Sequence, residues 1–169
     1  DKPGNGFHIN MSVKGNDGSS PMTAMIAGIL EKSADMTLFL NPTDDSYLRL
    51  GNCKAPKYIS WSAENRSQLI RIPAACGEFR RAEFRSPDPA ANPYLAYALM
   101  IYAGLYGIEN QLQLPAPHDI NLYAANEDTL KSIKRLPASL GEAALVASSS
   151  EFIEKHFSHS LIPEYCRRV

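Results

Sequence analysis

Apolar and polar residues alternate in the first part of the chain, which is the period of a β-strand. Phe7, Ile9 and Met11 follow this pattern, so that one face of the strand is apolar and the other is polar. The same pattern predicts three further strands, at residues 57–62, 68–73 and 80–86. Short polar or glycine-containing connections separate these three strands and favour antiparallel neighbours.

Apolar residues at intervals of three and four predict helices elsewhere in the chain. Ser20 is expected to cap a helix with Pro21 at its first position, and the apolar stripe continues to Leu30. A second helix is predicted from Asn92 to about Gln111; it is apolar nearly all round and is therefore expected to be buried. Four shorter helices are predicted at residues 130–135, 140–147, 151–157 and 161–168.

Strands that precede most of the helices indicate an α+β domain. We expect an antiparallel sheet that carries a polar face, packed by helices and followed by a helical C-terminal region. Residues 41–56 and 114–126 lack regular periodicity and are predicted to be loops. Neither a GxGxxG nor a GxxxxGK[ST] motif occurs, so the sequence supports neither a Rossmann nor a P-loop nucleotide site.

Composition adds limits on partners and location. The chain has 169 residues, 44% hydrophobic and 21% charged, as expected of one domain with a core. Its net charge of −1 provides no general attraction to nucleic acid or to a membrane, so we expect neither as a partner. Cys53, Cys76 and Cys166 lack the spacing of a zinc site and favour a cytoplasmic location.

The densest chemical signal is the segment RRAEFR at residues 80–85. On a strand, Arg81, Glu83 and Arg85 project from one face at intervals of about 6–7 Å. A surface ladder of ion pairs would explain such alternation and would stabilise little. However, six arginines between residues 49 and 85 accompany only three acidic residues. This excess favours the binding of phosphate or carboxylate, because each guanidinium offers a planar fork of donors.

Glu83 and His8 are candidates for metal binding. A carboxylate among arginines stays ionised, which suits a hard cation such as Mg²⁺. His8 lies on the polar face of the first predicted strand and can add an imidazole. One histidine and one glutamate do not complete a metal site, and a single histidine is more often a hydrogen-bonded residue than a ligand.

Several longer motifs are spread over nearly the whole chain: GNGFH at 4–8, NPT at 41–43, SYLRL at 46–50, NRS at 65–67, IRIP at 70–73, EFR at 83–85, PDPAANPYL at 87–95 and LPASLGEA at 136–143. In order and spacing they resemble the glutamine synthetase family. The resemblance implies that residues 1–169 are the C-terminal portion of the catalytic domain. The N-terminal domain and the first half of the catalytic domain would then be absent.

The resemblance also implies an activity, which is ATP-dependent ligation of glutamate and ammonia through a γ-glutamyl phosphate. It further implies two or more Mg²⁺ or Mn²⁺ ions in each complete site and, for the full-length protein, a large ring-shaped homo-oligomer. In that family, neighbouring subunits and earlier strands supply the rest of each site. We therefore expect the chain by itself to be inactive.

Roles are implied for individual residues by the same resemblance. His8 and Glu83 correspond to ligands of the metal nearer the nucleotide phosphates. Arg66 corresponds to the arginine on the transferred phosphoryl group. Arg49 is a candidate for both catalysis and substrate binding. The other residues implied for substrate are Gly4 and Arg85, and those implied for the nucleotide are Ser12, Arg71 and Arg81.

One segment departs from the family pattern. Residues 51–56 read GNCKAP, one residue shorter than usual, with Lys54 where the family has a glutamate that accepts a proton from ammonium. A lysine cannot act as an anionic ammonium site and would repel the substrate. Two alternatives therefore stay open, a γ-glutamyl ligase that uses a larger amine and a non-catalytic member that keeps its anion site. Tyr123, at a position that is nucleotidylated in some members, is interpreted as an ordinary loop tyrosine.

Overall fold

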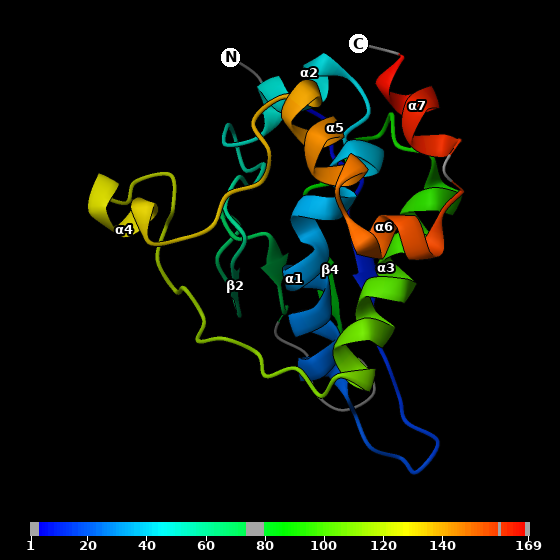
Figure 1. Cartoon of the computed structure of the whole chain (residues 1–169). Coiled ribbons are helices and arrows are strands. Elements are labelled where there is room, and N and C mark those ends of the chain that lie inside the picture. The colour runs from blue at the N-terminus through cyan, green and yellow to red at the C-terminus, as the bar shows by residue number, and fades with distance from the viewer. Residues whose placement is uncertain (1–3, 74–79, 159, 168–169) are drawn as a thin grey trace.

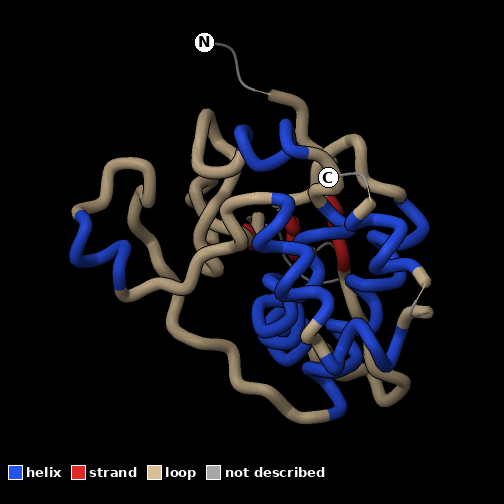
Figure 2. The backbone as a smooth tube through the Cα atoms, turned by 45° about the horizontal axis from the view of Figure 1, so that its top comes forward, coloured by secondary structure: helices blue, strands red, loops and turns tan. Residues whose placement is uncertain are grey.

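A small sheet and a helical layer make up the computed structural model, which describes residues 4–73, 80–158 and 160–167 (Figure 1). Cys76 lies outside these described residues. In the tube view of Figure 2, short strands lie at the centre of the molecule and helices pack beside them. The helix α4 and the loop before it stand apart from the helical body in both views. This arrangement is the expected α+β fold.

The described strands form one four-stranded sheet in the order β1-β4-β3-β2. Their bounds are Ile9–Met11 for β1, Trp61–Ser62 for β2, Ile70–Arg71 for β3 and Ala82–Phe84 for β4. β4 pairs antiparallel with both β1 and β3, and its pairing with β3 confirms the antiparallel neighbours predicted for these two strands. The strands are shorter than predicted, and Pro73, which has no N–H to donate, follows closely after β3.

The prediction of antiparallel neighbours is wrong for β2 and β3, which pair in parallel. The cause is the connection between them. Ser62 Oγ accepts a hydrogen bond from Asn65 N at 2.9 Å, and Asn65 Oδ1 accepts one from Ser67 N at 2.9 Å. These bonds fold the connection into a loop that returns the chain to the start of β2, so that β3 runs in the same direction.

The predicted strand at 57–62 forms hydrogen bonds with two different segments, the sheet and the C-terminal region. Only Trp61 and Ser62 belong to the sheet. Before them, Ile59 N donates to the carbonyl of Lys134 at 2.8 Å, and Leu136 N donates to the carbonyl of Lys57 at 2.8 Å. This segment therefore ties the sheet to the C-terminal helical region.

Two long helices form the centre of the core, α1 at Met22–Leu40 and α3 at Pro93–Glu109. They cross where Gly28 and Gly107 meet, since a Cβ atom on Gly107 would lie 2.7 Å from the backbone nitrogen of Gly28. α1 runs ten residues beyond the predicted stripe, to Leu40, which is fully buried. Only glycine allows the two backbones to approach this closely.

The two helix starts give different outcomes. Asn92 caps α3 as predicted, because its Oδ1 accepts from Tyr94 N at 3.0 Å. The predicted cap of α1 is wrong: the cap is Pro21 and not Ser20, and the Pro21 carbonyl accepts from Met25 N at 3.0 Å. α1 thus begins one residue later than predicted.

α3 is not buried on all sides, contrary to the prediction from its composition. Tyr94 is 83% exposed and Ile101 is 60% exposed, and Leu105 on the same helix is also exposed. The opposite side of the helix faces α1 and includes the fully buried residues Ala96 and Leu99. One apolar face of α3 is therefore open in this chain.

A short helix, α2 at Asp44–Arg49, occupies part of the segment that was predicted to be a loop. Thr43 caps it, since its Oγ1 accepts from Ser46 N at 3.3 Å. Asp44 and Asp45 lie in the first turn, where negative charge interacts favourably with the helix dipole. The cap and the two acidic residues were the available signal, and the helix was too short to show periodicity. α2 places Arg49 at its C-terminal end.

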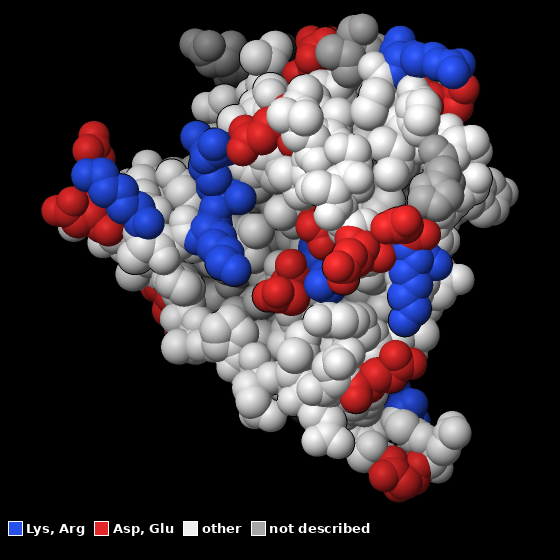
Figure 3. All heavy atoms as spheres, viewed as in Figure 1, with Lys and Arg blue, Asp and Glu red and all other residues white. Residues whose placement is uncertain are grey.

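The C-terminal region is helical, as predicted. Its helices are α4 at Glu127–Lys131, α5 at Leu140–Ser148, α6 at Glu151–His156 and α7 at Leu161–Cys166. α4 begins three residues earlier than predicted and ends four residues earlier. None of the helices in the described part of the chain combines the length and the apolar character that a membrane crossing requires. On the face in Figure 3, acidic and basic side chains are interspersed.

We expect a Glu142→Gln substitution to lower the stability of α5 at neutral pH and to lose this effect in acid. Glu142 Oε2 accepts from Ala138 N at 2.8 Å, and this bond holds the pKa of the carboxyl below its usual 4.5, with help from Arg135. The folded state thus gains stability above pH 4.5 and loses it as the pH falls through the lowered pKa. The expected loss at neutral pH is roughly 0.5 kcal/mol.

Urea unfolding at neutral and acid pH measures this difference. The control is Glu127→Gln, at a side chain that is 89% exposed and pairs only loosely with Lys131 at 3.8 Å. It should change stability little at either pH. Equal changes for both variants would contradict the role given to the bond between Glu142 and Ala138.

Candidate active site

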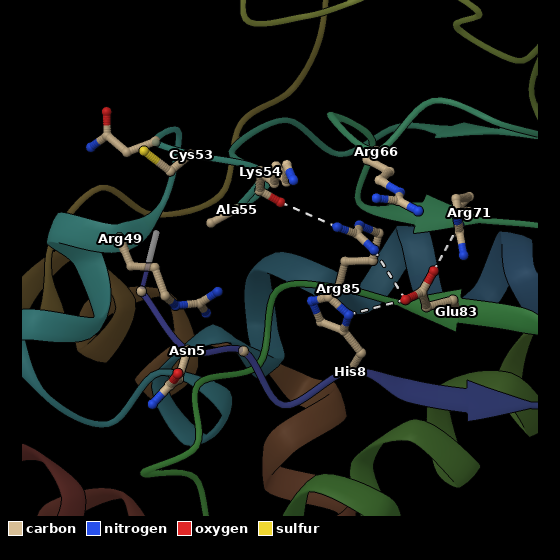
Figure 4. A pocket seen from close by; sticks show the side chains of 13 residues that line it. Asn5, His8, Arg49, Cys53, Lys54, Ala55, Arg66, Arg71, Glu83 and Arg85 are labelled. Atoms are coloured by element: carbon tan, nitrogen blue, oxygen red, sulfur yellow. Dashed lines mark hydrogen bonds and ion pairs between the residues drawn. The ribbon is translucent and has the colours of Figure 1, made fainter. Parts of the chain in front are cut away.

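A pocket of about 320 Å³ opens on the polar face of the sheet (Figure 4). It gathers residues from the segment before β1, the end of α2 and the loop that follows it, the β2–β3 connection, β3, and β4 with the residue after it. The lining residues are Gly4, Asn5, Gly6, His8, Arg49, Asn52, Cys53, Lys54, Ala55, Arg66, Arg71, Glu83 and Arg85. The lining thus contains five Lys or Arg side chains and one carboxylate, which makes it a site for anions.

Glu83 is the centre of the polar contacts in this pocket. Its Oε1 lies 3.0 Å from His8 Nδ1 and 3.0 Å from Arg85 Nη1. Its Oε2 accepts from Arg71 Nε at 2.7 Å. Burial by itself raises the pKa of Glu83, but Arg85, Arg71 and His8 together outweigh it and lower the pKa. Glu83 is therefore a carboxylate, as its arginine neighbours in the sequence predicted.

His8 is neutral at neutral pH. Burial, and then the positive charge of Arg85, lower its pKa below 6.5, although Glu83 opposes the shift. Because Nδ1 faces the Glu83 carboxylate, Nδ1 carries the proton and Nε2 keeps its lone pair. A Cβ atom on Gly6 would lie 2.9 Å from Nε2, so the glycine leaves space beside this nitrogen.

Arg49 is fixed by three neighbours on one side. Its Nε forms an ion pair with Asp88 Oδ2 at 3.3 Å. Its Nη2 donates to Asn41 Oδ1 at 3.1 Å and to the carbonyl of Ser86. Burial lowers the pKa of Arg49, and Asp88 counteracts this effect. Gly4 packs against the aliphatic part of the side chain, because a Cβ atom there would lie 3.4 Å from Arg49 Cδ.

The loop after α2 closes one side of the pocket in an unusual backbone conformation. Cys53 and Lys54 both have positive φ angles, +43° and +79°. Such angles are rare outside glycine and occur where the surrounding structure fixes them, often at functional sites. Here the Lys54 carbonyl accepts from Arg85 Nη2 at 3.3 Å, and Ala55 N donates to the Asn52 carbonyl at 2.9 Å.

The structure brings most of the predicted site residues together. Those that line the pocket are Gly4, His8, Arg49, Arg66, Arg71, Glu83 and Arg85. Ser12 and Arg81 do not line it. Arg81 Nε instead donates to Asn10 Oδ1 at 3.1 Å, across the β1–β4 pair and farther along the same sheet.

Sequence reasoning missed the residues that hold Arg49. Asp88 and Asn41 were recognised only as parts of longer motifs, and neither was given a role. Their contacts with Arg49 connect residues that are far apart in the chain, so no local pattern reveals them. An acidic residue between two prolines, in the PDP segment, was the available signal.

His8 and Glu83 are the residues that the sequence predicts to bind a metal ion. Within residues 4–73, 80–158 and 160–167, no group of three or more His, Cys, Asp or Glu side chains could hold an ion. Mg²⁺ and Mn²⁺ prefer about six ligands, mainly oxygen. The free Nε2 of His8 fits such an ion as one ligand, whereas Glu83 lies at the opposite nitrogen, Nδ1, and is not placed to bind the same ion in this arrangement.

The fold and site define an α+β domain with a cationic pocket on the polar face of its sheet, and comparison with known proteins identifies its family. The model of the glutamine synthetase catalytic domain matches residues 1–168. The chain therefore belongs to the glutamine synthetase family, which confirms the resemblance found in its motifs.

Curated relatives include glutamine synthetases from archaea and bacteria. The protein from Methanosarcina mazei is 43% identical over 143 residues, which is 83% of this chain and 32% of the relative. The protein from Pyrococcus abyssi is 44% identical over 154 residues, 83% of this chain and 35% of the relative. The protein from Clostridium saccharobutylicum is 40% identical over 177 residues, 96% of this chain and 40% of the relative. The relatives are ligases.

A solved structure, described as a GmaS/ADP complex, has the same fold. The TM-score is 0.80 and the sequences are 30% identical, over 97% of this chain and 41% of that chain. This match confirms the α+β fold class. The chain spans about a third to two-fifths of the length of the relatives and of this structure.

Proposed function

We propose that residues 1–169 are the C-terminal portion of the catalytic domain of an ATP-dependent ligase that joins glutamate to ammonia. The observation that carries this proposal is the pocket in which Glu83 organises His8, Arg71 and Arg85 within 3.0 Å. Family membership agrees with it. The other parts of each site would come from a preceding domain and from neighbouring subunits of a ring-shaped homo-oligomer.

The arginines of the pocket suit the anions of this reaction. Arg49 and Arg85 would bind the carboxylates of glutamate, with the backbone at Gly4 as a further contact. Arg66 would stabilise the phosphoryl group during its transfer from ATP to the glutamate side chain. Because the charge develops on phosphate and carboxylate oxygens, fixed guanidinium groups would lower the barrier without having to reorganise.

The nucleotide would extend from the pocket along the sheet. Arg71 lies in the pocket. Arg81 lies directly before the start of β4, and Ser12 lies directly after the end of β1. The related GmaS structure was solved with ADP, which supports a nucleotide site in this fold. Arg81 and Ser12 would then contact the part of ATP that is remote from the transferred phosphoryl group.

His8 would bind one of the Mg²⁺ or Mn²⁺ ions directly, with Glu83 behind it. When bound, such an ion neutralises phosphate charge and helps to orient the phosphoryl group. His8 would contribute Nε2, and its Nδ1 proton on Glu83 keeps the ring oriented, so Glu83 would support the ion through His8. The remaining ligands would come from outside this chain.

The proposal is tested with the full-length protein, ATP, Mg²⁺ and glutamate, with hydroxylamine in place of ammonia. We expect γ-glutamyl hydroxamate and ADP to form in equal amounts, because hydroxylamine attacks the acyl phosphate as an amine does. Residues 1–169 alone should form neither product. If the full-length protein binds ATP but forms no hydroxamate, it is a non-catalytic member of the family.

A further inference from the structure

Three of the cationic side chains that line the pocket already have carboxylate partners in the chain. Arg71 and Arg85 share Glu83, at 2.7 and 3.0 Å. Arg49 pairs with Asp88 at 3.3 Å and turns its Nη2 to other protein oxygens. These contacts partly compensate the charge of the three arginines before any ligand binds.

Lys54 and Arg66 are different. In the described part of the chain, neither side chain forms an ion pair or a hydrogen bond, although both line the pocket. In Figure 4 they lie on the same side of the pocket, across from His8. Two uncompensated cations that line one pocket produce a positive potential that attracts an anion. The proposed function assigns the phosphoryl group to Arg66 and leaves Lys54 without an anion.

The position of Lys54 is set by its backbone. Its φ of +79° follows that of Cys53 at +43°, and its carbonyl oxygen is bound by Arg85, the same arginine that contacts Glu83. The loop is therefore attached to the centre of the pocket, and the Lys54 side chain starts from a fixed point on the rim. A surface lysine that served only solubility would need no such attachment.

We propose that Lys54 determines the choice of amine acceptor and selects an amine that carries an anionic group, a carboxylate or a phosphate. This inference rests on the ATP-dependent γ-glutamyl ligase activity of the proposed function and replaces ammonia as the preferred acceptor. Ammonium and alkylammonium ions are cations, which Lys54 repels. An amine with an anionic group has no net positive charge, and its anion supplies the partner that Lys54 lacks.

The reaction with such an acceptor balances without further reactants. The amine nitrogen forms an amide bond to the acyl carbon of the γ-glutamyl phosphate. The bond from that carbon to the phosphate oxygen breaks, and its electron pair leaves on phosphate. The proton that the amine loses passes to the released phosphate or to water.

The test compares acceptors in matched pairs, using kcat/KM of the full-length protein. β-Alanine is compared with propylamine, and 2-aminoethyl phosphate is compared with ethylamine, with ammonia as a reference. We expect at least one amine with an anionic group to exceed its counterpart without that group by about tenfold, the ratio that 1.4 kcal/mol of ion pairing provides. The two pairs distinguish carboxylate from phosphate.

The variant Lys54→Gln should remove this preference. The matched control is Lys57→Gln, which loses the same charge three residues away, at a side chain that packs over Gly51 and not in this pocket. It should keep the wild-type ratio. Because Lys54 is exposed, its substitution is expected to leave the fold intact, which the urea midpoint checks.

Two results would overturn the inference. The first is a wild-type preference for ammonia or the simple alkylamines over both acceptors that carry an anionic group. The second is a Lys54→Gln variant that keeps its acceptor ratio and raises KM for ATP or glutamate instead, which would assign Lys54 to those substrates. Failure of the ligase proposal itself is recognised separately, because the full-length protein would then form no hydroxamate.

Discussion

Gly107→Ala is expected to destabilise the chain by about 3 kcal/mol or more, which is at or above the upper end of overpacking effects. A methyl group at this position would collide with the carbonyl oxygen of Ala24 and would lie 2.7 Å from the backbone nitrogen of Gly28. These atoms belong to the backbone of α1 and cannot rotate away. The two central helices would have to separate, and buried contacts between them would be lost.

The matched control is Gly141→Ala in α5. A Cβ atom there would meet nothing within 4 Å, so the substitution only removes the flexibility of a glycine in a helix. It should stabilise the chain by roughly 0.5–1 kcal/mol. Urea unfolding of both variants measures the difference. Equal midpoints for Gly107→Ala and the wild type would mean that α1 and α3 do not cross as closely as described.

Glu83→Gln is expected to destabilise the folded chain by about 3 kcal/mol, because it removes the only carboxylate among three basic side chains. Glu83 is 8% exposed, and its oxygens contact His8, Arg71 and Arg85. The amide keeps the shape of the side chain but not its charge. The arginines would then face one another in a buried position without a counter-ion.

Urea unfolding of residues 1–169 measures this effect without any substrate. The exposed variant Glu127→Gln is again the control and should change the midpoint little. In the full-length protein, Glu83→Gln should also lower hydroxamate formation more than 100-fold, as loss of a single charge-stabilising group commonly does. A variant with wild-type stability would show that the cations of the pocket do not depend on Glu83.

The polar face of the sheet was predictable because strand periodicity is a local property. The alternation of apolar and polar residues was enough to place His8 on the polar face of one strand. It also placed Glu83 and Arg85 on the same face of a second strand. The family motifs then indicated that these faces meet, and the β1–β4 register confirms it, with Asn10 opposite Glu83. Periodicity cannot identify a partner that lies in a distant segment of the chain, as Asp88 does for Arg49.

The errors have physical causes of the same kind. α2 has six residues and owes its existence to a threonine cap and acidic first-turn residues, so no period could reveal it. The parallel pairing of β2 and β3 depends on side-chain bonds within one loop. The exposure of Tyr94 and Ile101 on α3 could not be predicted from hydrophobicity, which indicates a preference for burial but not the presence of a neighbour to provide it.

The order of strands in the sheet has a consequence during synthesis on the ribosome. Among the described strands, β1 pairs only with β4, and 70 residues, Ser12 to Arg81, separate the two strands. At about 5–20 residues per second, β1 waits several seconds before its partner is made. During this interval its edge is unpaired and open to other chains. Nascent-chain crosslinking should therefore find Ile9 protected only after Phe84 has left the exit tunnel.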